Sequence, residues 1–246
     1  MSDEPPPTPA SRLDRLVESP ARLAQQLGRP LWQEVNDGES RGPVAVAVVT
    51  AMVLQVLLPR AFAIKPWWLI AAIEGTLVVG LLVANPRRIN RVSTRLRVAS
   101  LTLIAVLTAT NAWSAGRLIR HLVAGDKVTA RALLGAGAAI WFTNVIAFAM
   151  WYWELDRGGP ARRAQGTADA PPDFVYPQMT SPELSPRGWA PAFVDYFYLS
   201  FTNATAFSPT DTMPMSRWAK LMMMVQSGIS LVVVGLVIAR AVNVLS

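Results

Sequence analysis

The sequence predicts an all-α fold, a polytopic membrane helix bundle of five to six transmembrane segments of which the fifth is short. Of the 246 residues, 52% are apolar and only 16% are charged, whereas about a quarter of a soluble domain is charged. The apolar residues form nearly charge-free runs, and about 20 such residues in a helix cross the ~30 Å hydrocarbon layer. The runs lack the alternation of barrel strands, so helices must satisfy the backbone in lipid.

Residues 1–42 are expected to form a cytoplasmic tail. The first ten residues are acidic and rich in proline, without the basic and apolar regions of a signal peptide, and this composition is typical of disorder. Residues 11–27 can form an amphipathic helix, which either lies on the membrane surface or is an ordinary solvated helix.

Residues 43–153 are expected to contain four transmembrane helices. Their apolar runs are 43–58, 66–84, 98–116 and 132–153. The first run reaches spanning length only if it continues towards Ile64. Tryptophans at the ends of the second and fourth runs fit the headgroup level, where amphipathic rings settle.

Residues 154–188 are expected to form a flexible loop, because they are rich in Pro, Gly, Ala and charge. Residues 189–246 then hold a short polar and aromatic segment, 189–207, and a last transmembrane helix, 221–239. The short segment either crosses the membrane or enters it and returns on the same side.

The basic residues predict a cytoplasmic amino terminus, since Lys and Arg gather in cytoplasmic loops. Of the 23 Lys and Arg residues, fifteen fall on the side of the amino terminus if segment 189–207 crosses, and sixteen if it re-enters. Both arrangements give the same orientation, so charge does not choose between them.

Composition excludes several classes of site. The chain has no Cys and a single His, His121, so it offers no disulfide, no thiolate or histidine metal site and no Ser-His pair. It also lacks an HExxH run and a nucleophile elbow, so we expect neither an enzyme nor a cofactor. The net charge of +7 is spread between the apolar runs rather than over a soluble face, so we expect a lipid bilayer as partner and no nucleic acid.

The last 55 residues or so contain a short aromatic helix, a Thr-rich loop, an Asp followed by Pro, and a helix with glycine. This order resembles the pore helix, filter and inner helix of the two-span potassium channels. Thr205 matches the residue that opens their filter, Asp211 the one that closes it, and Gly228 lies near their hinge glycine. The resemblance implies a homotetramer that conducts monovalent cations.

The loop departs from the potassium filter. Both filter glycines are absent, and Pro209 is locked near φ −65°, whereas a carbonyl-lined filter needs its oxygens to point at one axis. The preceding loop also falls on the predicted cytoplasmic side, so a channel would be inverted. We therefore expect an ion-channel-like or transport protein without a standard potassium filter.

The chain is also similar to DUF family 1345, bacterial multi-pass membrane proteins of unknown function. The similarity rests on Trp-Glu-Leu-Asp at 153–156 followed by Arg-Gly-Gly, on the aromatic run 196–201, on 208–211, and on Ala and Asn in 241–243. It implies a place in the bacterial inner (plasma) membrane and no known activity.

The candidate pore or transport residues are Glu74, Asn203, Thr205, Ser208 and Asp211. An acid within a membrane segment is a functional-site hypothesis by default, although a protonated Glu74 bonded to a neighbouring helix is the structural alternative. Gly228 and Gly235, two turns apart on the last helix, are hinge or packing candidates.

Uncharged polar residues on the third, fourth and sixth segments, namely Asn111, Asn144 and Gln226, are expected to form interhelical hydrogen bonds. Two functions stay open. One is a permeation protein, and the other is a non-conducting membrane scaffold or partner subunit.

Overall fold

The structure, a computed structural model, describes residues 35–84, 88–124, 129–166, 171–186, 188–205 and 211–245. The expected disordered start and amphipathic helix lie outside the described residues. The described chain is mostly helical, which confirms the predicted fold class at this level.

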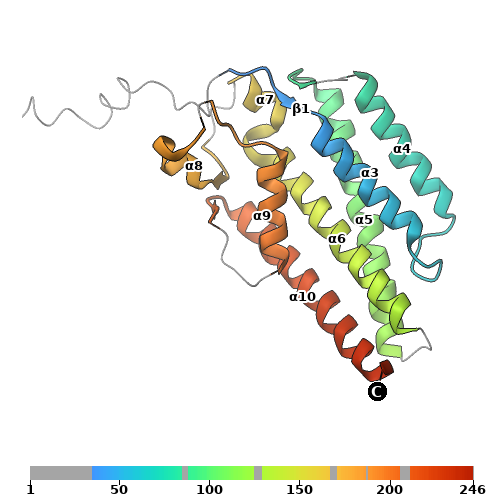
Figure 1. Ribbon diagram of the computed structural model, residues 1–246. Helices are drawn as coiled ribbons and strands as arrows, with labels where there is room; N and C mark the ends of the chain where they lie inside the picture. Colours follow the sequence, from blue (N-terminus) through green and yellow to red (C-terminus); the bar gives the residue numbers. More distant parts are fainter. Residues whose placement is uncertain are drawn as a thin grey trace, which may run out of the picture.

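Long antiparallel helices make up the body of the molecule (Figure 1). These are α3 (Gly42–Leu57), α4 (Trp67–Ala84), α5 (Thr94–Ala124), α6 (Ala130–Leu155) and α10 (Arg217–Leu245). By length and composition, the spans Thr94–Ala124, Arg131–Gly158 and Arg217–Arg240 can cross a membrane, whereas α3 and α4 are apolar but shorter. At 1.5 Å per residue, the 16 residues of α3 extend about 24 Å.

The two ends of the bundle differ. At one end, β1 (Glu39–Ser40) pairs antiparallel with β2 (Arg88–Ile89), so that the starts of α3 and α5 lie beside the ends of α4 and α6. We call this the β end. At the opposite, C-terminal end, the Phe62 ring in the connection from α3 to α4 meets His121 of α5 edge-on, with centroids 5.4 Å apart.

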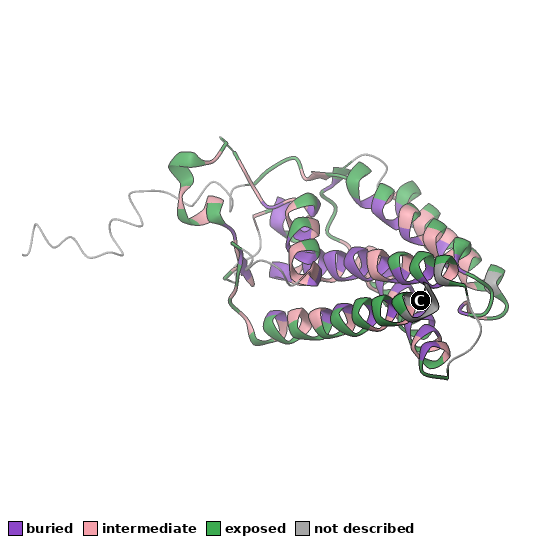
Figure 2. Ribbon diagram, turned by 60° about the horizontal axis from the view of Figure 1, so that its bottom comes forward, coloured by how far each residue is buried: buried purple, intermediate pink, exposed green. Residues whose placement is uncertain are grey.

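Helix α6 is the central helix and α10 a peripheral one. Helix α6 packs against α3, α5, α9 and α10, and 67% of its apolar span is buried compared with 22% for α10. Figure 2 shows exposed residues along the outer side of α10, up to the marked C terminus. That exposed side is apolar, as expected for a surface that faces lipid.

Helix α9 (Phe193–Thr205) has 13 residues and runs in the same direction as α10. Near the β end, Tyr196 and Trp218 both pack edge-on against Phe174. Deeper in the bundle, Asn203 of α9 donates to Gln226 of α10 at 2.8 Å. Since both helices start at the β end, Thr205 lies deep in the bundle.

After α9 the chain is back at the β end by residue 213. There β4 (Met213–Pro214) pairs antiparallel with β3 (Phe174–Val175), and the Met215 backbone N–H donates to the Asp173 carbonyl at 2.8 Å. Helix α9 therefore runs from the β end into the bundle, and β4 and the start of α10 lie at the β end again, as Figure 1 also shows.

The described part of 154–188 is folded against the β end, which differs from the flexible loop expected from composition. It forms η2 (Asp156–Gly158), α7 (Pro160–Ala164), β3, α8 (Pro177–Thr180) and η3 (Pro182–Leu184). The Phe174 and Tyr176 rings and the charged Asp156 are buried. These residues are separated in sequence by Gly, Pro and Arg, so no periodic pattern revealed the buried set.

Candidate functional site

Glu74 lies in a cavity between α3, α4 and α5. The cavity has a volume of about 250 Å³, and its lining includes Gln55, Glu74, Thr110 and Ser114. Arg60, in the connection between α3 and α4, lines it too, so the cavity extends from the C-terminal end of the bundle to the carboxylate. The Glu74 side chain is buried, with its residue 1% exposed.

Gln55 of α3 is the hydrogen-bond partner of Glu74. With its amide nitrogen turned towards α4, Gln55 donates to both carboxylate oxygens, at 3.1 and 3.2 Å. A single neutral amide offsets little of the cost of burying an ionised carboxylate among apolar side chains. The site therefore favours a protonated carboxyl or a carboxylate that holds a cation.

The cavity lining is mostly apolar, and its polar groups are the Glu74 carboxylate, the Gln55 amide, the Thr110 and Ser114 hydroxyls and the Arg60 guanidinium. Carboxylate, amide and hydroxyl oxygens can bind a proton or a hard cation. Among the described residues, no group of three or more His, Cys, Asp or Glu side chains could hold a metal ion.

The structure does not bring the other candidates to Glu74. Asn203 lies between α9 and α10, where its amide donates to the Met223 carbonyl at 3.0 Å as well as to Gln226. Thr205, the last residue of α9, donates to the Thr202 carbonyl at 2.9 Å within its own helix. Both side chains have partners inside the bundle.

Of the two loop candidates, Asp211 is exposed and lies two residues before β4. Ser208 lies outside the described residues. A path lined by residues of this region stays a prediction.

The expected interhelical hydrogen bonds of Asn111, Asn144 and Gln226 are confirmed. Asn111 of α5 donates to the Ile140 carbonyl of α6 at 3.1 Å, and Asn144 of α6 donates to Ser230 Oγ of α10 at 3.4 Å. Gln226 accepts from the Tyr152 hydroxyl at 2.6 Å and donates to Ser200 Oγ at 2.6 Å. This amide ties α6, α9 and α10 together.

Glycine packing is found on α6 and not at Gly228 or Gly235. A Cβ on Gly228 or Gly235 would meet no atom within 4 Å, so neither glycine serves a close approach among the described residues. A Cβ on Gly137 of α6 would lie 2.7 Å from Val237 Cγ2 of α10. Gly137 is thus where α6 and α10 approach each other closely.

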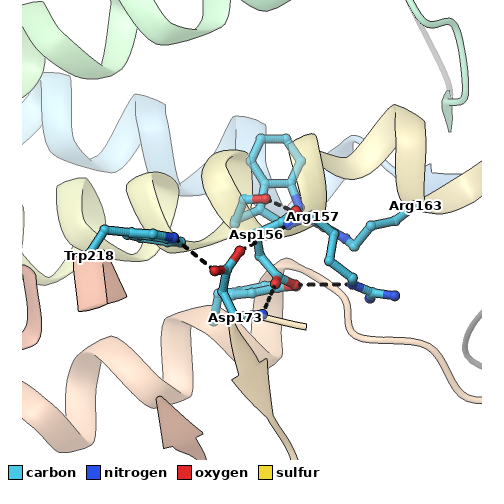
Figure 3. Close-up of polar contacts among 7 residues, drawn as sticks. Asp156, Arg157, Arg163, Asp173 and Trp218 are labelled. Atoms are coloured by element: carbon cyan, nitrogen blue, oxygen red, sulfur yellow. Dashed lines mark hydrogen bonds and ion pairs between the residues drawn. The ribbon is translucent and has the colours of Figure 1, made fainter. Parts of the chain in front are cut away.

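A charged cluster at the β end was missed by the sequence analysis (Figure 3). Asp156 accepts from the Tyr196 hydroxyl at 2.5 Å and from the Asp173 backbone N–H at 2.9 Å, and its carboxylate lies 3.6 Å from Arg157 Nε. Asp173 in turn accepts from Trp218 Nε1 at 2.8 Å. The cluster joins the end of α6 to β3 and the start of α10.

Arg163 closes the C-terminal end of α6. Its guanidinium donates to the carbonyls of Trp153 and Asp156, at 2.7 and 2.8 Å, and lies 5.0 Å from the Tyr196 ring centroid. Basic side chains stabilise helix C-termini by bonding the last carbonyls. The Trp-Glu-Leu-Asp run at 153–156 was the one sequence signal that marked this position.

Glu39 of β1 is a half-buried acid outside the long helices. Its carboxylate accepts from Trp153 Nε1 at 2.7 Å and from the Phe193 backbone N–H. Burial raises the pKa of Glu39 above its ordinary value of 4.5, although these hydrogen bonds act in the opposite sense.

Comparison with known proteins found no matching family model, no similar curated protein and no similar solved structure. The resemblances to the two-span potassium channels and to DUF family 1345 stay predictions.

Proposed function

We propose that the chain is a multi-pass membrane transport protein that binds a proton or a monovalent cation at Glu74. The observation that carries the proposal is a carboxylate, 1% exposed and lining a cavity of about 250 Å³ between apolar helices. Acids in such positions mark ion pathways and proton relays. The bound charge would be moved through the α3–α4–α5 side of the bundle, without a potassium-type filter.

The arrangement in the membrane follows from the helix directions. We propose five crossings, by α3, α4, α5, α6 and α10, with α9 re-entering from the β end. The β end carries most of the basic residues, and on the positive-inside rule we propose that it faces the cytoplasm of a bacterial cell. The Glu74 cavity then extends inwards from the outer side, and it lies within one chain, so this function needs no tetramer.

The first experiment tests occupancy of Glu74. Dicyclohexylcarbodiimide reacts with protonated carboxyl groups in apolar surroundings, so the purified protein in detergent should be modified at Glu74, as located by peptide mass spectrometry. Protection by NaCl or KCl, with choline chloride as control, identifies a metal cation, whereas protection only by high pH identifies a proton. Absence of modification at Glu74 at acidic pH would overturn the proposal.

The second experiment measures transport. Proteoliposomes containing wild-type protein should carry H⁺, Na⁺ or K⁺, and Glu74→Gln, which keeps the size and hydrogen bonding of the side chain, should lower the rate about tenfold or more, as loss of an essential ionisable group does. The matched control is Glu183→Gln, at an exposed position in η3. Equal rates for wild type and Glu74→Gln would contradict the proposal, once circular dichroism has shown that both are folded.

A second candidate function is a non-conducting scaffold or partner subunit. It is favoured by one observation, namely that Asn203, Ser200 and Gln226 use their polar groups on one another inside the α6–α9–α10 contact. Under this function the wild-type protein does not carry H⁺, Na⁺ or K⁺ in liposomes. Glu74 then reacts with the carbodiimide, and neither NaCl nor KCl protects it.

A further inference from the structure

A pocket lined by arginines lies at the β end, apart from the Glu74 cavity. It has a volume of about 210 Å³ and is enclosed by the starts of α3 and α5, the end of α6 and the turn before α7. Its lining includes Arg41, Arg91, Arg97 and Arg162 and one acid, Glu154. We call it the arginine pocket.

The charges in the arginine pocket favour an anion. Glu154 accepts a hydrogen bond from Ser100 Oγ at 3.1 Å, and its charge is opposed by Arg41, Arg97 and Arg163. Arg97 Nε is buried and has no hydrogen-bond partner among the described residues. The basic groups that line the pocket outnumber the acid.

An apolar groove continues from the arginine pocket along the bundle. The pocket and the groove share Arg41, Leu81 and Trp153, among other residues, and the groove then follows Val48 and Val78 on α3 and α4. The groove is smaller, about 40 Å³, and it lies between α3 and α4, with buried Leu103 of α5 and Met150 of α6 at its floor and exposed Leu82 at its edge.

A charged pocket at helix ends that opens into an apolar groove matches a molecule with an anionic head and a hydrocarbon tail. Basic pockets between transmembrane helices bind the headgroups of acidic lipids. Aliphatic side chains gain from covering an acyl chain, whereas a soluble phosphate would leave the groove unused. The pocket also lies at the level where α4 ends and α5 begins, where headgroups are found.

We propose that the arginine pocket and the groove together bind one anionic phospholipid. Its phosphate lies among Arg41, Arg91, Arg97 and Arg162, and the upper part of one acyl chain lies against Val48 and Val78. This site does not depend on the function proposed for Glu74.

The test uses the purified full-length protein in maltoside detergent, with bound lipid counted by native mass spectrometry. Wild-type protein should retain dioleoylphosphatidylglycerol about tenfold better than dioleoylphosphatidylcholine, and Arg91→Gln with Arg97→Gln should remove most of that preference. The matched control, Arg120→Gln with Arg131→Gln, neutralises two exposed arginines at the opposite end and should leave it unchanged. Arg91→Lys with Arg97→Lys should keep at least half of it.

Two further experiments distinguish a bound phospholipid from a bound soluble anion. Val78→Trp narrows the groove and should weaken phosphatidylglycerol retention several-fold without changing the charge. Inorganic phosphate and glycerol 3-phosphate, added without lipid, should not raise the melting temperature, whereas phosphatidylglycerol should. Stabilisation by the soluble phosphates equal to that by the lipid, or unchanged lipid retention in the Arg91→Gln, Arg97→Gln protein, would overturn the proposal.

Discussion

Asp156 and Glu74 are both buried carboxylates, but their surroundings give them different roles. Asp156 has a hydroxyl donor, a backbone donor and the Arg157 guanidinium within reach, so its charge is matched and its position is fixed. Glu74 has one amide partner and an adjoining cavity. A fully partnered acid holds a fold together, whereas an acid beside a cavity can exchange its proton or a cation.

Replacing Asp156 should strongly destabilise the β end. Asp156→Ala leaves the Arg157 charge buried without its carboxylate, and loss of one partner of a buried pair costs about 3–5 kcal/mol. Tryptophan fluorescence during thermal unfolding in detergent would measure the loss. The matched control is Asp37→Ala. The Asp37 side chain is 87% exposed, and its carboxylate lies 3.6 Å from the Arg88 guanidinium, so its loss should cost at most about 1 kcal/mol. Equal melting temperatures for the two variants would contradict this role.

Glu39 should make stability depend on pH in the direction opposite to most acids. Its pKa is raised by burial, so the folded chain binds the proton more tightly than the unfolded chain does. The free energy of unfolding should therefore fall as pH rises from about 4.5 through the folded-state pKa, and then level off.

The measurement for Glu39 is the melting temperature between pH 4 and pH 8 in one detergent, for wild type and for Glu39→Gln. The glutamine keeps an acceptor for Trp153 Nε1 but cannot ionise, so the variant should lose less stability over this range than wild type. A variant curve parallel to that of the wild type would show that other groups cause the dependence.

At the scale of the elements, α9 depends on α10 for its polar groups. Gln226 donates to Ser200 and accepts from Asn203, so two polar side chains of a 13-residue helix bond to one amide on α10. A helix of about 20 Å is too short to cross ~30 Å of hydrocarbon. These bonds therefore fix how deep α9 lies.

The α6–α10 contact should tolerate side chains at Gly135 but not at Gly137. A Cβ on Gly137 would lie 2.7 Å from Val237, whereas one on Gly135 would meet nothing within 4 Å. Gly137→Leu should lower the free energy of unfolding by about 1–3 kcal/mol through overpacking, and Gly135→Leu should be neutral or stabilising because Gly is a poor helix former. Thermal unfolding of the Gly137→Leu and Gly135→Leu variants in the same detergent measures the difference. An unchanged melting temperature for Gly137→Leu would mean that α10 can move away from α6 without loss of stability.

The sequence predicted these elements unevenly, for identifiable reasons. Apolar runs locate helices, and Glu74 was found because one charge within such a run is conspicuous. Spacing shows that glycines share a face but not which face meets another helix, and among the described residues Gly137, rather than Gly228 or Gly235, makes the close contact. The Asp156–Asp173 contact joins residues 17 apart across a segment rich in Pro, Gly and Ala, where no local pattern signals the pairing.

At the scale of the whole molecule, the direction in which each helix runs decides which end of the bundle its ends occupy. The sequence left open whether residues 189–207 cross, because composition measures affinity for lipid and not the direction of the chain. In the structure α9 and α10 both start at the β end. Helix α9 therefore does not carry the chain to the opposite end of the bundle. Helices α3, α4 and α6 were predicted to within a few residues, whereas α5 and α10 both begin before and end well after their apolar runs.

Accessibility labelling should distinguish re-entry from crossing. The chain has no Cys, so single cysteines at Glu183, Met215 and Val123, all exposed positions, report only themselves. Re-entry predicts that a membrane-impermeant maleimide reaches Glu183→Cys and Met215→Cys from the same side and Val123→Cys from the other. Labelling of Glu183→Cys and Met215→Cys from opposite sides would show that α9 crosses.

The dependence of α9 on Gln226 also orders events during biosynthesis. Asn203 and Gln226 are 23 residues apart, so at about 5–20 residues per second α9 leaves the ribosome roughly 1–5 s before its partner exists. During that interval Asn203 lacks its Gln226 acceptor and Ser200 lacks the Gln226 amide that donates to it, and the half-length helix gains little from entering lipid alone. We therefore expect helix α9 to stay at the membrane surface and to enter the bundle only after the ribosome has delivered the first half of α10.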